Sequence, residues 1–239
     1  MRALVDQLPD PGRYILEGDE AHHLLKVKRI RVNEEVEFLD GKGGRAFCHV
    51  EHTEKKKIHL QVNSVKREKP PEEFGLALAI PCQLSTLNTM LPGLVQVGIT
   101  RLFLCETEFS GPLKKVQPQL RRFHNILSQS LKQCGRAWIP TLELTTFNTL
   151  VDEKEDHVFS DWHIYHPGGS TWECERHHLK KPLLILIGPE GGFSEKEVKQ
   201  AASVGATILG LGAAILKMET AAIGVCFRAN QYQNEVSRG

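Results

Sequence analysis

The sequence predicts an α/β protein in which a parallel sheet alternates with helices and is preceded by a small domain of short strands. In the first seventy residues, apolar and polar residues alternate as they do in half-buried strands. From residue 74 onward, continuous apolar runs are separated by segments with helical spacing, which is typical of a parallel sheet covered by helices. At 239 residues, the chain is long enough for one large or two modest domains.

The N-terminal part contains three alternating segments and a turn cluster. The segments are residues 34–41, 45–53 and 57–65, and "DGKGG" between the first two is a hairpin-type turn. Several short strands joined by such turns indicate a small β-barrel. The charged, proline-bearing stretch "REKPPEE" then has the composition of a linker, so we expect one domain over 1–72 and a second over 73–239.

The C-terminal part begins with "FGLALAIP" (74–81), a run apolar enough for a strand buried on both faces. A helical stretch up to Gly98 follows, and then a second buried strand at 101–106. Three further short strands are predicted at 157–162, 182–188 and 206–212.

The remaining helices are predicted from spacing and from capping signals. Apolar residues recur at helical intervals over 116–134, and Gly135 is placed to end that helix. Ser194 and Glu197 form a capping-box pattern, so a helix is expected to start at Ser194. A last helix is expected over about 218–231.

Composition excludes several classes of protein. The chain is 41% hydrophobic and 25% charged, which is ordinary for a globular protein with a core. The N-terminus lacks the apolar run of a secretory signal, and no stretch approaches the roughly 18 apolar residues of a membrane span. The six cysteines are scattered without a CxxC pair, which suits reduced thiols and a cytoplasmic location better than a disulfide framework.

Charge is distributed unevenly, although the net charge is only +1. Between residues 111 and 142 there is no Asp or Glu. The same stretch contains Lys114, Lys115, Arg121, Arg122, Lys132 and Arg136. A locally basic surface of this kind fits a phosphate-bearing partner, and the alternative is a solvated helix face balanced by acids elsewhere.

Two glycine-containing segments, 188–192 and 210–212, follow predicted strands. In parallel α/β sheets, ligands bind outside the carboxyl ends of the strands, and glycine lets backbone groups approach a ligand closely. Neither GxGxxG nor GK[ST] is present, so a dinucleotide or a triphosphate is not indicated. Backbone amides without a lysine suit an adenine and ribose better, and the alternative is a pair of tight turns.

Four segments resemble one known family. "LLILIGPEGGFSEKEV" (183–198) and "LGLGAAILKMETAAIGV" (209–225) resemble the C-terminal signature of the SPOUT methyltransferases that modify N3 of a uridine in 16S small-subunit ribosomal RNA. The stretch "QCGRAWIPTLE" (133–143) resembles the Gln-x-x-Arg…Ile-Pro segment of that family. Residues 22–44 resemble its RNA-binding barrel of PUA type, so the resemblance spans both expected domains.

The resemblance implies a C-terminal trefoil-knot domain that binds S-adenosylmethionine through backbone groups. It also implies a homodimer acting on ribosomal RNA or the small ribosomal subunit, with no metal and no DNA or membrane partner. The implied cofactor-binding residues are Gly188, Pro189, Glu190, Gly191, Gly192, Leu209, Gly210, Gly212, Ile215 and Leu216.

Chemistry adds roles for charged residues. Uridine N3 carries a proton that must leave, so a base or a stabiliser of the uracil anion is needed. Arg136, Glu190 and Lys217 are the expected catalytic residues; Arg136 could instead be a helix-terminal charge, and Glu190 could simply hold its loop. RNA contacts are expected from Lys26, Lys28, Arg29, Arg121, Arg122 and Arg136.

The sequence also departs from the family pattern. Lys217 replaces an arginine, and Phe109 replaces the arginine of a Thr-x-Arg-Ser segment. One alternative is therefore a SPOUT-fold RNA-binding protein with a different RNA target or reduced catalysis. A second alternative is a zinc-binding protein that uses His163, His166, Cys174 and His177.

Overall fold

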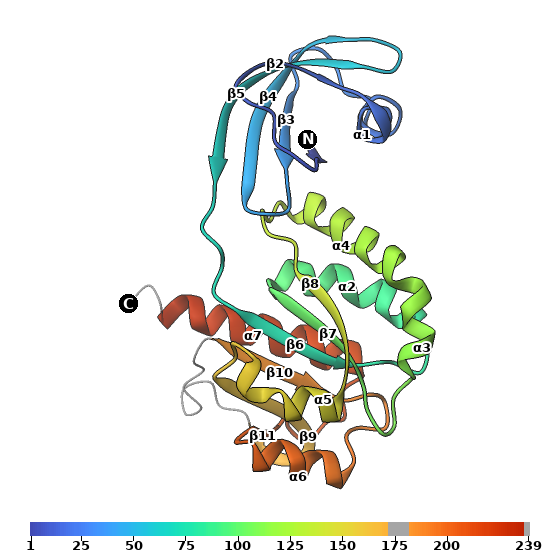
Figure 1. The fold of residues 1–239 in the computed structure, drawn as a ribbon, viewed down its shortest axis with the longest axis vertical. Coiled ribbons are helices and arrows are strands. Elements are labelled where there is room, and N and C mark those ends of the chain that lie inside the picture. Colours follow the sequence, from blue (N-terminus) through green and yellow to red (C-terminus); the bar gives the residue numbers. More distant parts are fainter. Residues whose placement is uncertain (172–181, 237–239) are drawn as a thin grey trace. The chain divides into compact units, whose positions relative to one another are not determined.

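The structure is a computed structural model that describes residues 1–171 and 182–236 (Figure 1). The described residues divide into two units. The first unit comprises Met1–Pro71 and Ser128–Ile139, and the second comprises Glu72–Leu127 and Pro140–Gly239. Each unit has its own sheet.

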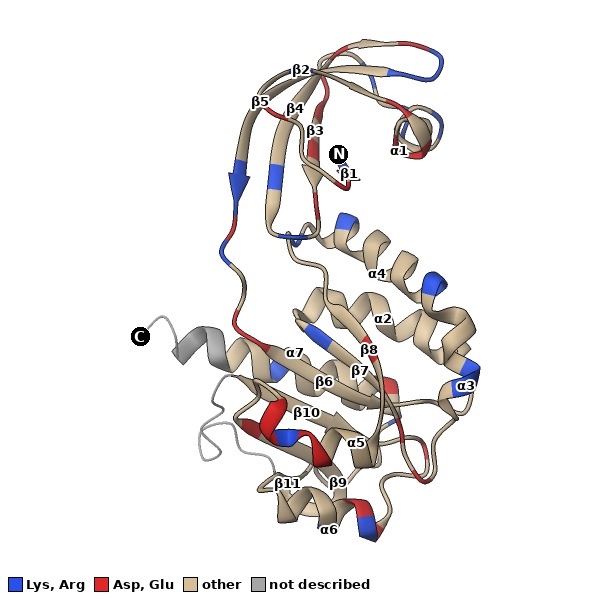
Figure 2. Cartoon of the chain, viewed as in Figure 1, with Lys and Arg blue, Asp and Glu red and all other residues tan. Residues whose placement is uncertain are grey.

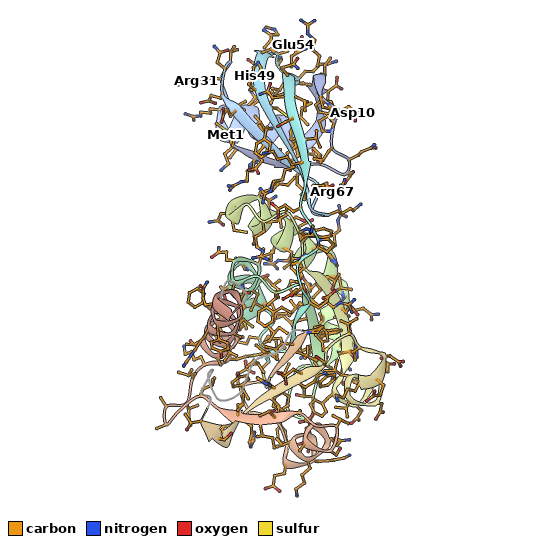
Figure 3. All side chains as sticks on the ribbon, turned by 90° about the vertical axis from the view of Figure 1, so that its left-hand side faces the viewer. Met1, Asp10, Arg31, His49, Glu54 and Arg67 are labelled. Carbon is orange, nitrogen blue, oxygen red and sulfur yellow. The ribbon has the colours of Figure 1, made fainter. Side chains whose placement is uncertain are left out.

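The first unit contains a five-stranded sheet of order β1-β3-β4-β5-β2. Its strands are β1 (Arg2–Leu4), β2 (Gly12–Leu16), β3 (Glu35–Leu39), β4 (Gly44–Thr53) and β5 (Ile58–Arg67). The predicted strands at 34–41, 45–53 and 57–65 are confirmed as β3, β4 and β5. Figure 3 shows the β4–β5 hairpin, with Glu54 at its turn and Arg67 at its opposite end.

Not all of the N-terminal part is β structure. A short helix, α1 (Gly18–His22), runs into a π-helical turn, η1 (His23–Lys28), which ends at Arg29 in the left-handed region with φ 55°. Ala21 and Leu24 from these turns are buried with Val36 and Phe38 in the core of the sheet. Because the apolar positions here follow one short helical face, an alternating pattern cannot reveal them.

The second unit is built on a six-stranded sheet of order β11-β9-β10-β6-β7-β8, with every neighbouring pair parallel. The strands are β6 (Phe74–Ala79), β7 (Arg101–Glu106), β8 (Thr141–Thr146), β9 (Asp161–Thr171), β10 (Leu183–Ile187) and β11 (Thr207–Gly210). Every residue of β6 and β10 is buried, which explains their continuous apolar runs. The predicted parallel sheet is therefore confirmed.

One predicted strand is misplaced. The strand expected at 157–162 begins only at Asp161 and continues to Thr171 as β9. Phe159 precedes the strand and packs edge-on to Phe103, with ring centroids 6.2 Å apart. Phe159 is therefore part of the core without belonging to a strand, whereas its neighbour Val158 is exposed.

The helices of the second unit cover both faces of its sheet. They are α2 (Ser85–Val97), α3 (Leu113–Val116), α4 (Leu120–Cys134), α5 (Phe147–Asp152), α6 (Glu195–Ser203) and α7 (Met218–Val236). Helices α2 and α7 pack together, and Figure 1 shows α5 and α6 on the opposite face. Helix α4 continues from the second unit into the first.

The prediction of a single helix over 116–134 is wrong at the start of that range. A 3₁₀ turn, η2 (Gln117–Gln119), separates α3 from α4, and Pro118 lies inside it. Proline has no backbone N–H to donate to the preceding turn, which weakens an α-helix at that point. Helix α2 nevertheless continues through Pro92, so a proline alone does not decide where a helix breaks. The helix predicted to begin at Ser194 is confirmed as α6, and the final helix as α7, which runs on to Val236.

Over the described ranges 1–171 and 182–236, none of the helices combines the length and the apolar character needed to cross a membrane.

Candidate functional site

Three loops follow neighbouring strands of the second unit, because β10, β6 and β7 are adjacent and parallel. We call them the glycine loop (188–193, after β10), the β6 loop (80–84) and the β7 loop (107–112). The N–H of Gly111 in the β7 loop donates to the carbonyl of Ile80 at 2.9 Å. The three loops therefore lie at the carboxyl end of the sheet, where α/β proteins bind ligands.

The glycine loop is a tight turn whose backbone is open to contact. The N–H of Gly192 donates to the carbonyl of Pro189 at 2.8 Å, and Gly192 has φ 74°, which other residues rarely adopt. At Gly191, a β-carbon would lie 3.3 Å from Cβ of Phe109 in the β7 loop. A larger side chain at position 191 would therefore push the two loops apart.

Glu197 joins the glycine loop to the β7 loop. It is the third residue of α6 and only 6% exposed. One carboxylate oxygen accepts from the N–H of Ser194 at 2.9 Å and completes the predicted capping box; the other accepts from the N–H of Glu108 at 2.8 Å. One buried carboxylate thus fixes the start of α6 and the course of the β7 loop.

Glu190, at the exposed tip of the glycine loop, contacts the β6 loop. Its carboxylate accepts a hydrogen bond from the N–H of Cys82 at 3.3 Å. A hydrogen bond to the same carboxylate, reinforced by its negative charge, raises the pKa of the Cys82 thiol. The sequence leaves Glu190 either a catalytic role or a role in holding its loop. The contact with Cys82 supports the second role.

The second glycine segment lies at the end of β11. Leu209 is buried, and a β-carbon at Gly210 would lie 2.8 Å from the carbonyl oxygen of Gly169 on β9. Beyond Gly212, whose φ is 95°, the chain becomes exposed. Ile215 is 93% exposed, and Leu216 and Lys217 are exposed as well. This aliphatic surface is available to the apolar part of a ligand.

The basic residues lie on separate elements, as Figure 2 shows for lysine and arginine. In the second unit, Arg121 and Arg122 are exposed at the start of α4, and Lys114 and Lys115 are exposed on α3. In the first unit, exposed cations lie at the end of η1. These are Lys26, Lys28 and Arg29.

Arg136 lies in the first unit, just after the end of α4. The preceding turn is held by two arginines: Arg45 donates to the carbonyl of Gly135 at 2.7 Å, and Arg2 donates to that of Gln133 at 3.1 Å. These contacts satisfy carbonyls that the end of a helix leaves unpaired. The position of Arg136 is therefore fixed by strands of the first unit.

Glu37 on β3 bridges the same two arginines, with the Nε of Arg2 2.8 Å from its carboxylate and a hydrogen bond from Arg45 on the other oxygen. Partial burial acts to raise the pKa of Glu37, but the hydrogen bonds and charges of Arg2 and Arg45 hold it below its ordinary value. Lys132 also forms an ion pair within the first unit, with its Nζ 2.6 Å from the carboxylate of Glu20. Lys132 thus supports the fold of the first unit.

The residues of the zinc hypothesis do not converge in the described part of the chain. His163 and His166 are both on β9, three residues apart, and side chains at that spacing point to opposite faces of a strand. His163 is buried, with its Nε2 3.2 Å from the carboxylate of Asp161. Cys174 and His177 lie outside the described residues. Within residues 1–171 and 182–236, no three potential metal ligands gather.

The sequence did not reveal two contacts between the loops. One joins Cys82 to Glu190, and the other joins Glu108 to the second oxygen of Glu197. Cys82 lies within three residues of the end of β6, and Glu108 lies within three residues of the end of β7. The rule that ligands bind at the carboxyl ends of parallel strands would have indicated both loops.

Comparison with known proteins agrees with this geometry. Residues 67–229 match the model of an RNA methyltransferase domain, and residues 16–63 match an RNA methyltransferase PUA domain. Ribosomal RNA small subunit methyltransferase E from Helicobacter pylori is 28% identical over 203 residues, covering 82% of this chain and 85% of that protein. The protein of the same name from Mycobacterium bovis is 27% identical over 238 residues, covering 91% and 86%.

A solved structure is similar over nearly the whole chain. It is a protein from Legionella pneumophila, assigned as a methyltransferase and determined in complex with the bound cofactor SAM. It matches with a TM-score of 0.81 and 26% identity and covers 96% of each chain. The glycine loop, β6 and β7 all fall within the matched RNA methyltransferase domain. The chain therefore belongs to the RNA methyltransferase family that this domain model describes.

Proposed function

We propose that this protein uses S-adenosylmethionine to methylate N3 of a uridine in 16S small-subunit ribosomal RNA. The observation that carries the proposal is the glycine loop, which the β6 and β7 loops fix at the carboxyl end of a parallel sheet. The names of the relatives support ribosomal RNA as substrate, and the SAM complex from Legionella supports the cofactor.

The residues of the two glycine segments fit this cofactor. A β-carbon at Gly191 would contact Phe109, and one at Gly210 would contact the carbonyl oxygen of Gly169, so glycine lets both segments pack closely against the neighbouring chain. Exposed Ile215 and Leu216 offer apolar surface to an adenine ring. The proposed binding set is Gly188, Pro189, Glu190, Gly191, Gly192, Leu209, Gly210, Gly212, Ile215 and Leu216.

When bound, S-adenosylmethionine supplies an electrophilic methyl group on its sulfur. The protein then has to orient the uracil and make the loss of its N3 proton less costly. The cations of Arg136 and Lys217 would stabilise the uracil anion, and Glu190 would hold the glycine loop through Cys82.

The proposed domain arrangement follows the resemblance of the sequence. Residues 1–72 would form a PUA-type barrel and residues 73–239 a knotted SPOUT domain, apart from 128–139, which the structure groups with the first unit. Exposed Lys26, Lys28 and Arg29 would contact RNA phosphates, and binding would weaken with salt. A homodimer in the cytoplasm completes the proposal.

The experiment combines purified protein, methyl-labelled S-adenosylmethionine and small ribosomal subunits that lack the modification. We expect N3-methyluridine in nucleoside mass spectrometry. If cofactor binds but no methylated nucleoside appears on any ribosomal RNA, the proposed reaction is wrong and an RNA-binding role is favoured.

A further inference from the structure

Phe109 is an exposed aromatic residue beside the glycine loop. Its side chain is 50% exposed, although most large apolar side chains of the second unit are buried. Its Cβ would lie 3.3 Å from a β-carbon at Gly191, so the ring extends from a point directly beside the loop backbone. The exposed part of the ring is apolar surface that a ligand could remove from water.

The backbone that carries Phe109 is fixed on both sides. The N–H of Glu108 donates to buried Glu197 at 2.8 Å, and the N–H of Thr107 donates to Oγ of Ser110 at 2.8 Å. The N–H of Gly111 is bound to the β6 loop. An aromatic ring on a backbone held in this way loses little conformational entropy on binding, so it is preorganised to stack on a flat ligand.

Two exposed lysines follow Phe109 in the chain. Lys114 and Lys115 follow the loop on α3, are exposed, and form no ion pair with any described residue. The charge of Lys115 reaches the β6 loop, where it opposes the rise in the pKa of the Cys82 thiol.

Carboxylates lie on the elements that neighbour these two lysines. Those of Glu106, Glu190 and Glu197 each accept a backbone N–H, and that of Glu108 is exposed to solvent. Charge therefore does not select the ligand of Phe109. The exposed ring itself suits a flat base, because the bases of single-stranded nucleic acid stack on aromatic side chains.

We propose that Phe109 stacks on the target nucleobase of the RNA when that base leaves its own stack. The inference rests on the proposed function, since it places the base beside the loop that would hold the cofactor. In the proposed function, the exposed Ile215 and Leu216 offer apolar surface to the adenine of S-adenosylmethionine, which leaves the ring of Phe109 for the base of the RNA. Extruding a base for chemistry requires such a surface to replace the stacking that is lost.

The test compares Phe109→Ala and Phe109→Tyr with the wild-type protein on small ribosomal subunits that lack the modification. Stacking energies predict that Phe109→Ala lowers kcat/KM for the subunit roughly 5- to 150-fold. Phe109→Tyr retains a flat ring and is expected to stay within about threefold of the wild type. In both variants, calorimetry is expected to show unchanged affinity for S-adenosylmethionine.

Val158→Ala is the matched control, because Val158 is an apolar residue of the same unit with 49% exposure. It is expected to change neither kcat/KM nor cofactor affinity. Phe109→Leu separates stacking from simple apolar contact. If leucine restores activity as well as tyrosine does, the stacking proposal is overturned.

Two other results would also overturn the inference. A matching loss of cofactor affinity in Phe109→Ala would mean that the ring holds the adenine of the cofactor. Unchanged kcat/KM in Phe109→Ala would mean that the ring does not touch the base.

Failure of the proposed function is recognised separately, because the wild-type protein would then form no N3-methyluridine. In that case, fluorescence anisotropy with a single-stranded fragment of small-subunit ribosomal RNA tests the inference. Weaker binding by Phe109→Ala than by Phe109→Tyr would support a base-stacking role, and equal binding would overturn it.

Discussion

The carboxylate of Glu197 accepts a hydrogen bond of 2.8 Å from the backbone N–H of Glu108, a residue that lies 89 positions earlier in the chain. Its other oxygen caps α6 through Ser194. The glycine loop ends directly at that cap, so the same side chain fixes the end of the glycine loop and the course of the β7 loop. Stability and cofactor affinity should therefore respond together when Glu197 is removed.

We expect Glu197→Ala to lower the free energy of unfolding by roughly 2–4 kcal/mol, because the N–H groups of Ser194 and Glu108 lose their acceptor. Ser194→Ala removes only the cap and should cost about 1 kcal/mol. Urea unfolding measures both values. Glu195→Ala is the control, since Glu195 is 93% exposed on the same turn and should change stability by less than about 1 kcal/mol. Equal effects of the Glu195 and Glu197 variants would contradict the bridging role.

Gly191→Val should abolish binding of S-adenosylmethionine while the protein stays folded. A β-carbon there lies 3.3 Å from Cβ of Phe109, and the added methyl groups would block the backbone of the loop. Calorimetry measures the affinity, and circular dichroism measures the fold. Gly224→Ala on α7 is the control, because its β-carbon would meet no atom within 4 Å. Unchanged cofactor affinity in Gly191→Val would remove the glycine loop from the binding site.

Arg136→Ala should lower kcat at least about 100-fold, as expected when a stabiliser of a developing anion is lost. Cofactor affinity should stay the same, since Arg136 is proposed to act on the uracil anion and is not in the proposed cofactor-binding set. Methyl transfer and calorimetry separate the two quantities. Arg13→Ala, an exposed arginine of the first unit, should have little effect. Equal losses of turnover and cofactor affinity in Arg136→Ala would contradict the assignment.

Glu37 should make the first unit sensitive to acid. Its pKa is lower in the folded protein than the unfolded value of about 4.3, because Arg2 and Arg45 outweigh the effect of its burial. A carboxyl of this kind stabilises the fold above its unfolded pKa and loses that contribution as the pH falls through its folded pKa. Urea unfolding between pH 7 and 3 should show Glu37→Gln less stable near neutrality, with the difference shrinking below about pH 4. The exposed Glu35→Gln should show no such trend.

Glu190→Gln should make Cys82 react faster with iodoacetamide at pH 8. The hydrogen bond with Glu190, together with its charge, raises the pKa of the Cys82 thiol, so removing the carboxylate increases the thiolate fraction. Mass spectrometry of the Cys82 peptide measures the rate. Cys105 provides an internal control, because burial raises its pKa to about 12 and keeps it unreactive in both proteins. A slower reaction in the variant would show that Glu190 does not act on this thiol.

Strands were predictable where burial left a clear signal. The fully buried strands β6 and β10 appear in the sequence as unbroken apolar runs, and β4 and β5 show alternation. The edge strand β8 was missed, because it is only partly buried and mixes threonine with glutamate. β1 has three residues, too few for any periodicity.

Helix boundaries depended on local chemistry. The cap of α6 was predictable, since Ser194 and Glu197 are three residues apart and interact within one turn. Pro118 is also visible in the sequence, but the apolar spacing on either side of it continued and concealed the 3₁₀ turn between α3 and α4. Spacing records which face of a helix is buried and does not record a break in its backbone.

By itself, the sequence determined the parallel sheet, the two glycine segments and the cap that follows the first of them, because each depends on residues close together in the chain. Tertiary structure alone decided that Glu197 reaches Glu108, that Phe109 lies beside Gly191, and that Arg45 holds the turn before Arg136. The contact of Arg45 spans 90 residues. Residues so far apart in the chain come together only when the sheets have formed. Such a hydrogen bond leaves no periodic pattern in the sequence, so the sequence alone does not reveal it.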